Sequence, residues 1–415
     1  MKTQMNIWLI SKYAAPIQYA RGGARLFLLA REFAKMGNMV TLVTSDSNHF
    51  SNYPDTDNVY NKEKKDNVDI LWIKTKKYQK TASMARLLSW FDFEIKLFSM
   101  NLKNMDRPEV IIVSSLSIFS IVYGYYLKRK FNAFLVFEIR DIWPLTLTEE
   151  GGFSKWHPLV VFIGFLEKFG YKRADLIVGT MPRLYLHVKN ILGYDKPFFC
   201  SPLGFAPENY NTNEACSIVD VNPFRSQIPE NKVIVGYAGS MGLTNALDSF
   251  IESIKLANKH TNIHFLLVGD GDLKISFEKQ LKGYNNVAFL GKVPQNQVKN
   301  FLYICDILYL STQHSKVWDY GQSMNKVVEY MLAAKPIIAS YVGYPSMINE
   351  ACCGKFVNSD KPEILKDAIL DYANMSKEQR SHIGMKGRDW IYRERKYSKL
   401  AQKYLEIIKK FRNYK

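Results

Sequence analysis

Four polar residues in one short stretch have the types and spacing to bind a phosphorylated sugar derivative. Residues 320–339 read YGQSMNKVVEYMLAAKPIIA, and their apolar spacing predicts a helix that begins at about Asn325. Ser323 and Lys326 flank this start, and Glu329 follows about one turn later. A helix N-terminus favours an anion, Lys326 adds a full charge, and a carboxylate can accept hydrogen bonds from sugar hydroxyls. These residues fit a nucleoside-diphosphate site. The alternative interpretation is that both charged side chains are solvated and the helix only covers a sheet.

Strands and loops around this helix would position it. Lys335 and Pro336 end the helix, since proline cannot continue it, and the β-branched run at 337–340 predicts a buried parallel strand. A similar unit begins with the strand KVIVGY at 232–237, followed by a glycine-rich loop and an apolar helix face. Backbone N–H groups in that loop could bind a diphosphate. The candidate residues there are Gly239, Ser240, Met241 and Gly242.

The first half of the chain holds two further candidate positions. Gly22 and Gly23 precede a helix, where the missing Cβ atoms let backbone N–H groups approach a ligand, and Arg25 could contact a phosphate. A tight turn is the alternative explanation of the glycines. Arg140 and Asp141 end the strand at 134–139, the edge where open α/β sheets bind ligands, although they could simply pair with each other.

Length and composition set the domain organisation and the class of partner. At 415 residues the chain fits two domains. We expect them at 1–196 and 231–385, with a linker rich in Pro, Asn and Ser at 197–230 and an amphipathic helix at 386–415. The 56 basic and 39 acidic residues give a net charge of +17, which implies an anionic partner. No nucleic-acid-binding motif is present, so nucleic acid is not expected. The five cysteines show no metal-ligand spacing, and they suit a reducing cytoplasm.

The quoted motifs resemble those of family 4 glycosyltransferases, which have the GT-B fold. The resemblance is strongest at 236–250 and 318–339 and weaker at 20–33 and 138–144. YGQSMNK and RDIWP are most similar to the bacterial N-acetylfucosamine transferase-like branch, which acts in O-antigen and capsule assembly. Glu329 matches the second of the family's two glutamates, which contacts the donor ribose. The first would fall at Gly321, so this chain lacks it, as it lacks the family's His, Arg and Lys near the donor.

The resemblance implies an α/β protein with two Rossmann-like domains facing across a cleft and a C-terminal helix crossing back to the first domain. It implies retaining, metal-independent transfer of a sugar from a UDP-sugar to a polyprenyl-diphosphate-linked or glycan acceptor, without a cofactor. The sugar would be an N-acetylated amino or deoxyamino sugar of a surface polysaccharide such as lipopolysaccharide or capsule. Lys326 would stabilise the leaving diphosphate, and Arg140 and Asp141 would position the sugar or acceptor. Lys292 and Val293 would present backbone groups to the donor base.

Two other functions are compatible with parts of the sequence. A UDP-sugar 2-epimerase would share the nucleotide site, but it needs general bases near the sugar, and histidines and paired carboxylates are scarce here. A basic membrane-binding protein on the same scaffold would need no catalytic residues.

The sequence also favours contact with an anionic membrane. Residues 80–107 carry a wide apolar and aromatic stripe flanked by Lys and Arg, which is typical of a helix lying in a membrane interface. A core helix with snorkelling lysines is the alternative. The basic tail after residue 386 has a similar stripe, which we expect to pack on the first domain while its lysines face the bilayer. The charge-free window at 110–127 predicts a strand, a turn and a helix, not a membrane span. We therefore expect a cytoplasmic protein, peripheral on the inner face of the membrane.

Overall fold

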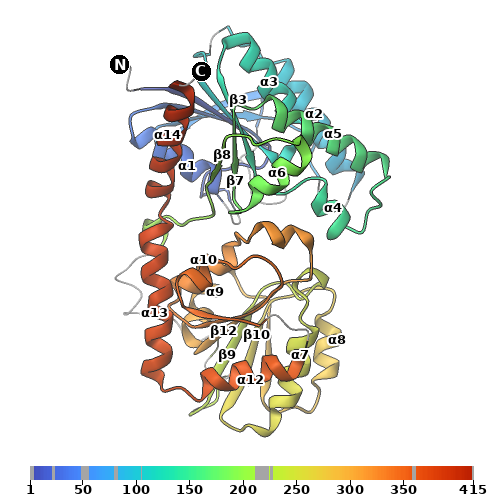
Figure 1. The fold of residues 1–415 in the computed structure, drawn as a ribbon, viewed down its shortest axis with the longest axis vertical. Coiled ribbons are helices and arrows are strands. Elements are labelled where there is room, and N and C mark those ends of the chain that lie inside the picture. The colour runs from blue at the N-terminus through green and yellow to red at the C-terminus, as the bar shows by residue number, and fades with distance from the viewer. Residues whose placement is uncertain are drawn as a thin grey trace. The chain divides into compact units, whose positions relative to one another are not determined.

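Strands and helices alternate along both halves of the chain in a computed structural model that describes residues 4–20, 24–47, 56–78, 83–103, 105–210, 224, 228–357 and 361–413. The chain divides into two units (Figure 1). The first comprises residues 1–206 together with 397–415, and the second comprises residues 207–396. Each unit has one mainly parallel sheet covered by helices, which confirms the predicted α/β class.

The first sheet has the strand order β3-β4-β2-β1-β5-β6-β7-β8. Its strands are parallel except for the antiparallel pair β3 and β4. They are β1 (Asn6–Ile10), β2 (Met39–Ser45), β3 (Tyr60–Lys65), β4 (Val68–Ile73), β5 (Val110–Ser114), β6 (Phe134–Ile139), β7 (Leu176–Gly179) and β8 (Phe198–Cys200). The helices are α1 (Arg25–Lys35), α2 (Met84–Phe98), α3 (Ser120–Phe131), α4 (Leu145–Glu149), α5 (Pro158–Arg173), α6 (Leu184–Leu192) and α14 (Tyr397–Asn413).

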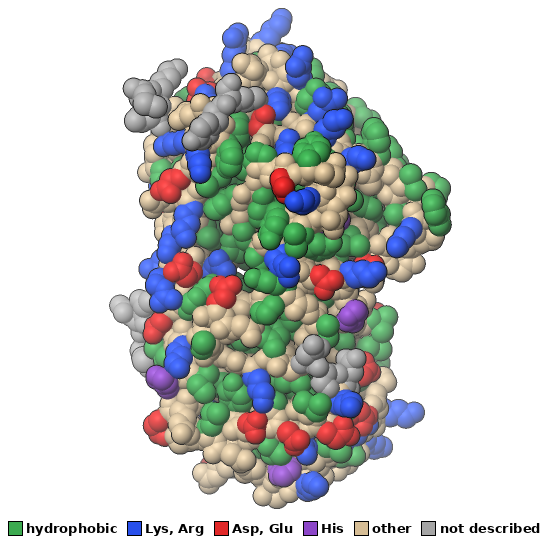
Figure 2. Space-filling view, in the orientation of Figure 1, with side chains coloured by type: hydrophobic (Ala, Val, Ile, Leu, Met, Phe, Trp, Pro, Cys, Tyr) green, Lys and Arg blue, Asp and Glu red, His purple; other side chains and the backbone are tan. Residues whose placement is uncertain are grey.

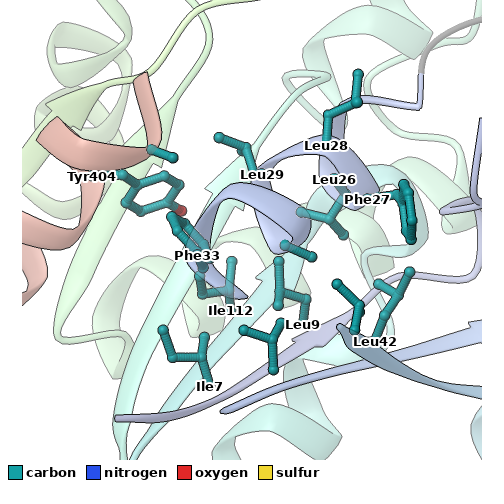
Figure 3. Packing of buried hydrophobic residues seen from close by; sticks show 14 of the residues in the cluster. Ile7, Leu9, Leu26, Phe27, Leu28, Leu29, Phe33, Leu42, Ile112 and Tyr404 are labelled. Atoms are coloured by element: carbon teal, nitrogen blue, oxygen red, sulfur yellow. The ribbon is translucent and has the colours of Figure 1, made fainter. Parts of the chain in front are cut away.

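The C-terminal helix α14 completes the core of the first unit. Figure 3 shows the apolar side of α1 on the sheet, with Phe33 near Ile112 of β5. Tyr404 of α14 meets the Phe33 ring edge-on, with the ring centroids 5.7 Å apart. The stripe of α14 that contains Tyr404 and Ile408 is buried in this cluster. The predicted return of the last helix to the first domain is confirmed.

The end of the chain is two helices where the sequence predicts one over 386–415. Helix α13 (Lys377–Glu394) belongs to the second unit, and α14 begins at Tyr397 in the first. The N–H of Tyr397 donates to the carbonyl of Phe205 at 3.0 Å, so it does not continue the hydrogen bonding of the preceding helix. This bond to the first unit explains where the two helices separate.

The first sheet extends into the segment expected to be a linker. Strand β8 pairs with β7 in parallel, with Phe199 opposite Val178. The carbonyl of Pro197 accepts a hydrogen bond from Ile177 at 2.9 Å. A proline at the start of an edge strand is compatible with pairing, because its missing N–H can face away from the ladder. The first unit therefore ends later than predicted. The prediction was wrong because it took a segment rich in Pro, Asn and Ser to be a linker.

The second sheet is fully parallel, in the order β11-β10-β9-β12-β13-β14. Its strands are β9 (Val233–Ala238), β10 (Ile263–Val268), β11 (Val287–Gly291), β12 (Ile307–Ser311), β13 (Ile337–Ser340) and β14 (Gly354–Val357). Its other helices are α7 (Asp248–Leu256), α8 (Lys274–Gln280), α9 (Gln295–Ile304), α10 (Asn325–Leu332), α11 (Met347–Glu350) and α12 (Pro362–Ala373). Helix α10 begins at Asn325, as the sequence predicts.

Among the described residues, no helix combines the length and apolar character that crossing a bilayer requires.

Candidate functional site

The first turn of α10 is fixed beside the loop that follows β9, at residues 239–247, which we call the β9 loop. Tyr330 of α10 anchors the helix, because its hydroxyl accepts from the N–H of Ala238 at 3.0 Å and lies 3.3 Å from the Ala238 carbonyl. Lys326 then extends toward this loop. Its Nζ is 3.3 Å from Oδ1 of Asn245, 3.5 Å from the hydroxyl of Tyr237 and 4.7 Å from the centre of the Tyr237 ring. The structure thus brings Lys326 to the β9 loop.

The electrostatic surroundings of Lys326 leave its charge poorly compensated. Burial lowers the pKa of Lys326 to about 8, and the nearby carboxyl of Glu329 only partly opposes this effect. The partners of Nζ are a carbonyl-type oxygen, a hydroxyl and a ring, none of which carries a full negative charge. A cation in partly dry surroundings without a close anionic partner is well suited to bind an anion.

Glycines let the β9 loop approach Lys326 and the loop after β10 closely. A Cβ atom at Gly239 would collide with Nζ of Lys326. One at Gly269 would collide with the Gly239 carbonyl, and one at Gly271 would lie 2.7 Å from the Met241 carbonyl. The two loops therefore pack backbone against backbone. The sequence analysis singled out Gly239 for its approach to a ligand, and the structure adds an approach to a side chain.

The β9 loop does not offer all the N–H groups expected of it. The N–H of Met241 donates to the carbonyl of Asp270 at 2.9 Å, and the Met241 side chain lies in the core of the second unit. Met241 is therefore a structural residue, and its expected contact with the donor is corrected. The N–H groups of Ser240 and Gly242 have no hydrogen-bond partner in the described part of the chain. These two remain the loop's candidate donors to a diphosphate.

Glu329, Ser323 and Asn325 lie at the start of α10, as expected. Met324 occupies the N-cap position, and none of the described side chains caps the helix, so its first N–H groups are available to a ligand. Asn325 is exposed, while Ser323 and Glu329 are partly exposed. Burial raises the pKa of Glu329, whereas Lys299 of α9 and Lys326 act in the opposite direction. Lys299 is a second cation near this carboxyl, which the sequence analysis did not single out.

Lys292 and Val293 directly follow β11 at the same edge of the second sheet. The carbonyl of Gly291 accepts from the N–H of Gly269 at 2.8 Å, which joins the end of β11 to the loop after β10. Lys292 is exposed and Val293 is partly exposed. The loops after β9, β10 and β11 thus share one edge, but the described contacts do not link Lys292 or Val293 to Lys326.

Arg140 and Asp141 lie at the equivalent edge of the first sheet, after β6. Both are partly exposed. The hydroxyl of Ser115 orders this corner, because it accepts from the N–H of Arg140 at 2.9 Å and donates to the Asp141 carbonyl at 3.2 Å. Burial raises the pKa of Asp141, and Arg140 and Arg86 oppose that shift. Within the described structure the two side chains form no ion pair with each other.

Arg25 is a correction to the sequence analysis. Its guanidinium has no exposure and forms an ion pair with Glu138 of β6, with Nε 3.5 Å from Oε1. Its Nη atoms donate to the carbonyls of Ser201 at 2.7 Å and Pro202 at 3.2 Å. Arg25 therefore holds the first unit together and is not available to a phosphate. Gly22 and Gly23 lie outside the described residues.

The sequence analysis missed three residues near the start of α10. Asn245 and Tyr237 contact Lys326, and only the folded loop brings them there. Gln322 is 5% exposed, and neither atom of its amide has a hydrogen-bond partner among the described residues. An unsatisfied buried amide is costly, so a ligand that completed its hydrogen bonds would bind favourably.

In the described part of the chain, no three His, Cys, Asp or Glu side chains gather in a way that could hold a metal ion.

Comparisons with known proteins agree with this architecture. The family model "Glycosyl transferases group 1" matches residues 232–374, which contain the β9 loop and α10. No curated protein matches the chain. The solved structure of sucrose-phosphate synthase from Thermosynechococcus elongatus has a TM-score of 0.71 at 15% identity, covering 99% of this chain and 100% of that one.

Two further solved structures are similar over nearly the full length. One is the E. coli trehalose-6-phosphate protein bound with UDP-2-fluoro glucose, with a TM-score of 0.71, 12% identity and coverage of 97% of this chain and 99% of that chain. The other is Anabaena Alr3699/HepE in complex with UDP and glucose, with a TM-score of 0.65, 15% identity and coverage of 98% and 100%. These likenesses establish the two-unit GT-B fold. The family match adds a similarity to group 1 glycosyltransferases over residues 232–374. The finer resemblance to the N-acetylfucosamine transferase-like branch stays a prediction.

Proposed function

We propose that this protein transfers a sugar from a UDP-sugar to an acceptor hydroxyl and that Lys326 binds the departing diphosphate. The observation that carries the proposal is the position of Lys326, a partly buried cation between the β9 loop and the uncapped start of α10. Both elements lie in the stretch that matches group 1 glycosyltransferases. Two of the similar solved structures contain UDP or a UDP-sugar analogue, which supports the choice of nucleotide.

In the proposed reaction the bond between the sugar's anomeric carbon and the diphosphate oxygen breaks, and its electron pair remains on the diphosphate. Lys326, the N–H groups of Ser240 and Gly242, and the first N–H groups of α10 stabilise this growing charge. The acceptor oxygen forms the new bond on the same face, and its proton passes to the departing phosphate. Glu329 binds the donor ribose, Lys292 and Val293 border the base, and Arg140 and Asp141 position the acceptor or sugar.

The finer assignments follow the N-acetylfucosamine transferase-like motifs YGQSMNK and RDIWP. They favour an N-acetylated amino or deoxyamino sugar as the donor group. They also favour a polyprenyl-diphosphate-linked or glycan acceptor, as used in assembling bacterial lipopolysaccharide or capsule. We therefore propose that the transfer retains the configuration of the sugar and needs no metal. We also propose that the protein acts at the anionic inner surface of the cytoplasmic membrane. In the absence of the family's first glutamate, we assign Gln322 to the donor sugar, because its buried amide has no hydrogen-bond partner among the described residues.

A panel assay tests the function. The protein is incubated with UDP-linked hexoses and UDP-linked N-acetylamino sugars, each with polyprenyl-diphosphate-linked and free glycan acceptors, and products are identified by mass spectrometry. We expect a glycosylated acceptor and free UDP from at least one combination. Interconversion of the donor sugar without an acceptor would indicate an epimerase instead. Calorimetry that detects no binding of UDP would indicate a non-catalytic protein on this scaffold.

Replacing Glu329 with alanine should weaken UDP binding by roughly 10- to 100-fold. The reason is that a hydrogen bond to an ionised group contributes about 1.5–3 kcal/mol. Calorimetric titration with UDP measures the effect, and Glu350→Ala, at the end of α11, serves as a control at an exposed glutamate. Should Glu329→Ala bind UDP as tightly as the parent protein, this carboxylate does not contact the nucleotide.

The rate constant kcat/KM for the donor should fall as the pH rises above about 8. Burial lowers the pKa of Lys326 to about 8, so this side chain is charged below that pH and neutral above it. Only the charged form stabilises the diphosphate. A pH profile of kcat/KM for the parent and for Lys326→Arg tests this, because arginine stays protonated throughout the range. The same alkaline decline in both proteins would assign the titration to another group.

A further inference from the structure

The side of the first unit that carries α2 and α5 exposes an unusual number of large apolar side chains. Figure 1 shows α2, α3 and α5 on the same side of the first sheet, and Figure 2 shows hydrophobic side chains gathered at that margin. We call this surface the aromatic face and define it by six residues with exposures from 44% to 88%. They are Phe91, Ile95 and Phe98 on α2, and Trp156, Phe162 and Phe165 in or just before α5.

The exposed sides of α2 and α5 form one surface. The ring of Phe119 lies between them, with its centroid 5.4 Å from that of Phe91 and 6.1 Å from that of Phe162. The core does not need the exposed set, because other residues of both helices already face the sheet. Phe93 and Ile163, for example, are 0% and 2% exposed. Both helices are therefore apolar on two sides, and one of these sides has no described neighbour to bury it.

The exposed charges of α3 and α5 beside the aromatic face are positive. Arg129 and Lys130 end α3, and Lys168 and Lys172 lie on α5, and all four are exposed. The one acidic residue of α3 and α5 is Glu167, which is buried and hydrogen-bonded to Tyr171 at 2.9 Å and His187 at 2.7 Å. It adds no exposed negative charge to this side.

The acidic residues of α2 do not change this balance. Asp92 lies 2.8 Å from Nζ of Lys96, and Glu94 is buried against Ser117 and Ser120. Exposed aromatic residues next to uncompensated Lys and Arg match the chemistry of a lipid interface with anionic headgroups. A protein partner would need a complementary acidic rim around an apolar patch of the same outline.

We propose that the aromatic face docks the first unit on an anionic lipid bilayer, with Trp156 and Phe165 entering the interface. This inference rests on the proposed function, since a lipid-linked acceptor has to be met at a membrane surface. It also assigns the membrane contact to particular elements, α2 and α5. The sequence analysis divided it between residues 80–107 and the lysines of the C-terminal tail. The apolar stripe of α14 is buried against α1, as expected there, so the tail adds no apolar surface. Helix α5 supplies the other half of the surface.

Co-sedimentation with vesicles of phosphatidylcholine alone or with phosphatidylglycerol tests the docking face. The double variant Phe162→Ser/Phe165→Ser should partition onto the anionic vesicles at least ~10-fold less than the parent protein. Ile275→Ser is the matched control, because Ile275 is 79% exposed on α8 of the second unit, and it should bind like the parent. High salt should weaken parent binding, since the charged part of the attraction is screened.

Trp156, which is 88% exposed, offers a second measurement that does not depend on the folding of the double variant. Anionic vesicles should shift the tryptophan emission of the parent to shorter wavelength, and Trp156→Phe should lose most of this shift while it still sediments. Equal binding of the double variant and the parent would overturn the proposal. So would equal binding to both vesicle types, or a dimer in solution that the double variant dissociates. Calorimetry with UDP on the same samples tests the proposed function separately.

Discussion

Replacing Lys326 with alanine should lower the rate of sugar transfer by at least ~10²-fold, because it removes a cation from the charge that develops on the diphosphate. The reason lies in where the side chain is held. Nζ lies beside Asn245 and Tyr237 in partly dry surroundings, where a charge interacts more strongly than in water. Steady-state rates with the donor and acceptor identified by the panel assay measure the effect.

Two variants serve as controls for Lys326→Ala. Lys355→Ala removes another lysine of the second unit, one paired with Asp371 at the surface, and should leave the rate unchanged. Lys326→Arg keeps the charge with a different shape and should retain part of the activity. A thermal unfolding measurement confirms that Lys326→Ala is folded. If its turnover stays within a few-fold of the parent, the assignment of Lys326 to the diphosphate is wrong.

Local patterns in the sequence were enough to predict most of the second unit. Helix α10 begins at Asn325, and the strand–loop–helix order around the Gly239 loop follows from apolar spacing and glycine positions. The contact between Lys326 and Asn245 could not be predicted this way, because the two residues are 81 positions apart. Their proximity depends on the packing of α10 against the end of β9, which the Tyr330 hydroxyl fixes.

The same limit applies to α5, whose exposed apolar side the sequence alone does not reveal. Its sequence is apolar on almost every side, and apolar character alone does not tell which side the sheet will cover. The structure settles that Ile163 and Leu166 face inward and that Phe162 and Phe165 remain exposed. For α2 the stripe was wide enough to suggest an exposed apolar side from the sequence.

The error at Arg25 had a signal that the sequence analysis did not use. A cation at the start of a helix suggests an anion site, but Glu138 stands within the otherwise apolar strand FLVFEI. A carboxylate in a buried strand needs a cationic partner, because an unpaired charge there is very costly. Arg25 is that partner, with both side chains fully buried.

The second large effect should follow from replacing Arg25 with methionine, which should reduce the free energy of unfolding of the first unit by about 3–5 kcal/mol. The substitution leaves Glu138 buried without its cation. It also removes the guanidinium that donates to Ser201 and Pro202, in the segment after β8. Among the described residues, the hydrogen bond that remains to Glu138 comes from the uncharged Tyr404 hydroxyl of α14, at 3.3 Å from Oε2. Thermal and urea unfolding, with Arg129→Met as an exposed arginine control, measure the loss.

A second substitution separates the cost of the unpaired carboxylate from the loss of the arginine contacts. In the double variant Arg25→Met/Glu138→Leu no charge is left buried, so part of the lost stability should return. A double variant as unstable as Arg25→Met would mean that the hydrogen bonds to Ser201 and Pro202, not the ion pair, account for the effect. Unchanged stability of Arg25→Met itself would contradict the structural role of this residue and reopen the question of its contact with a phosphate.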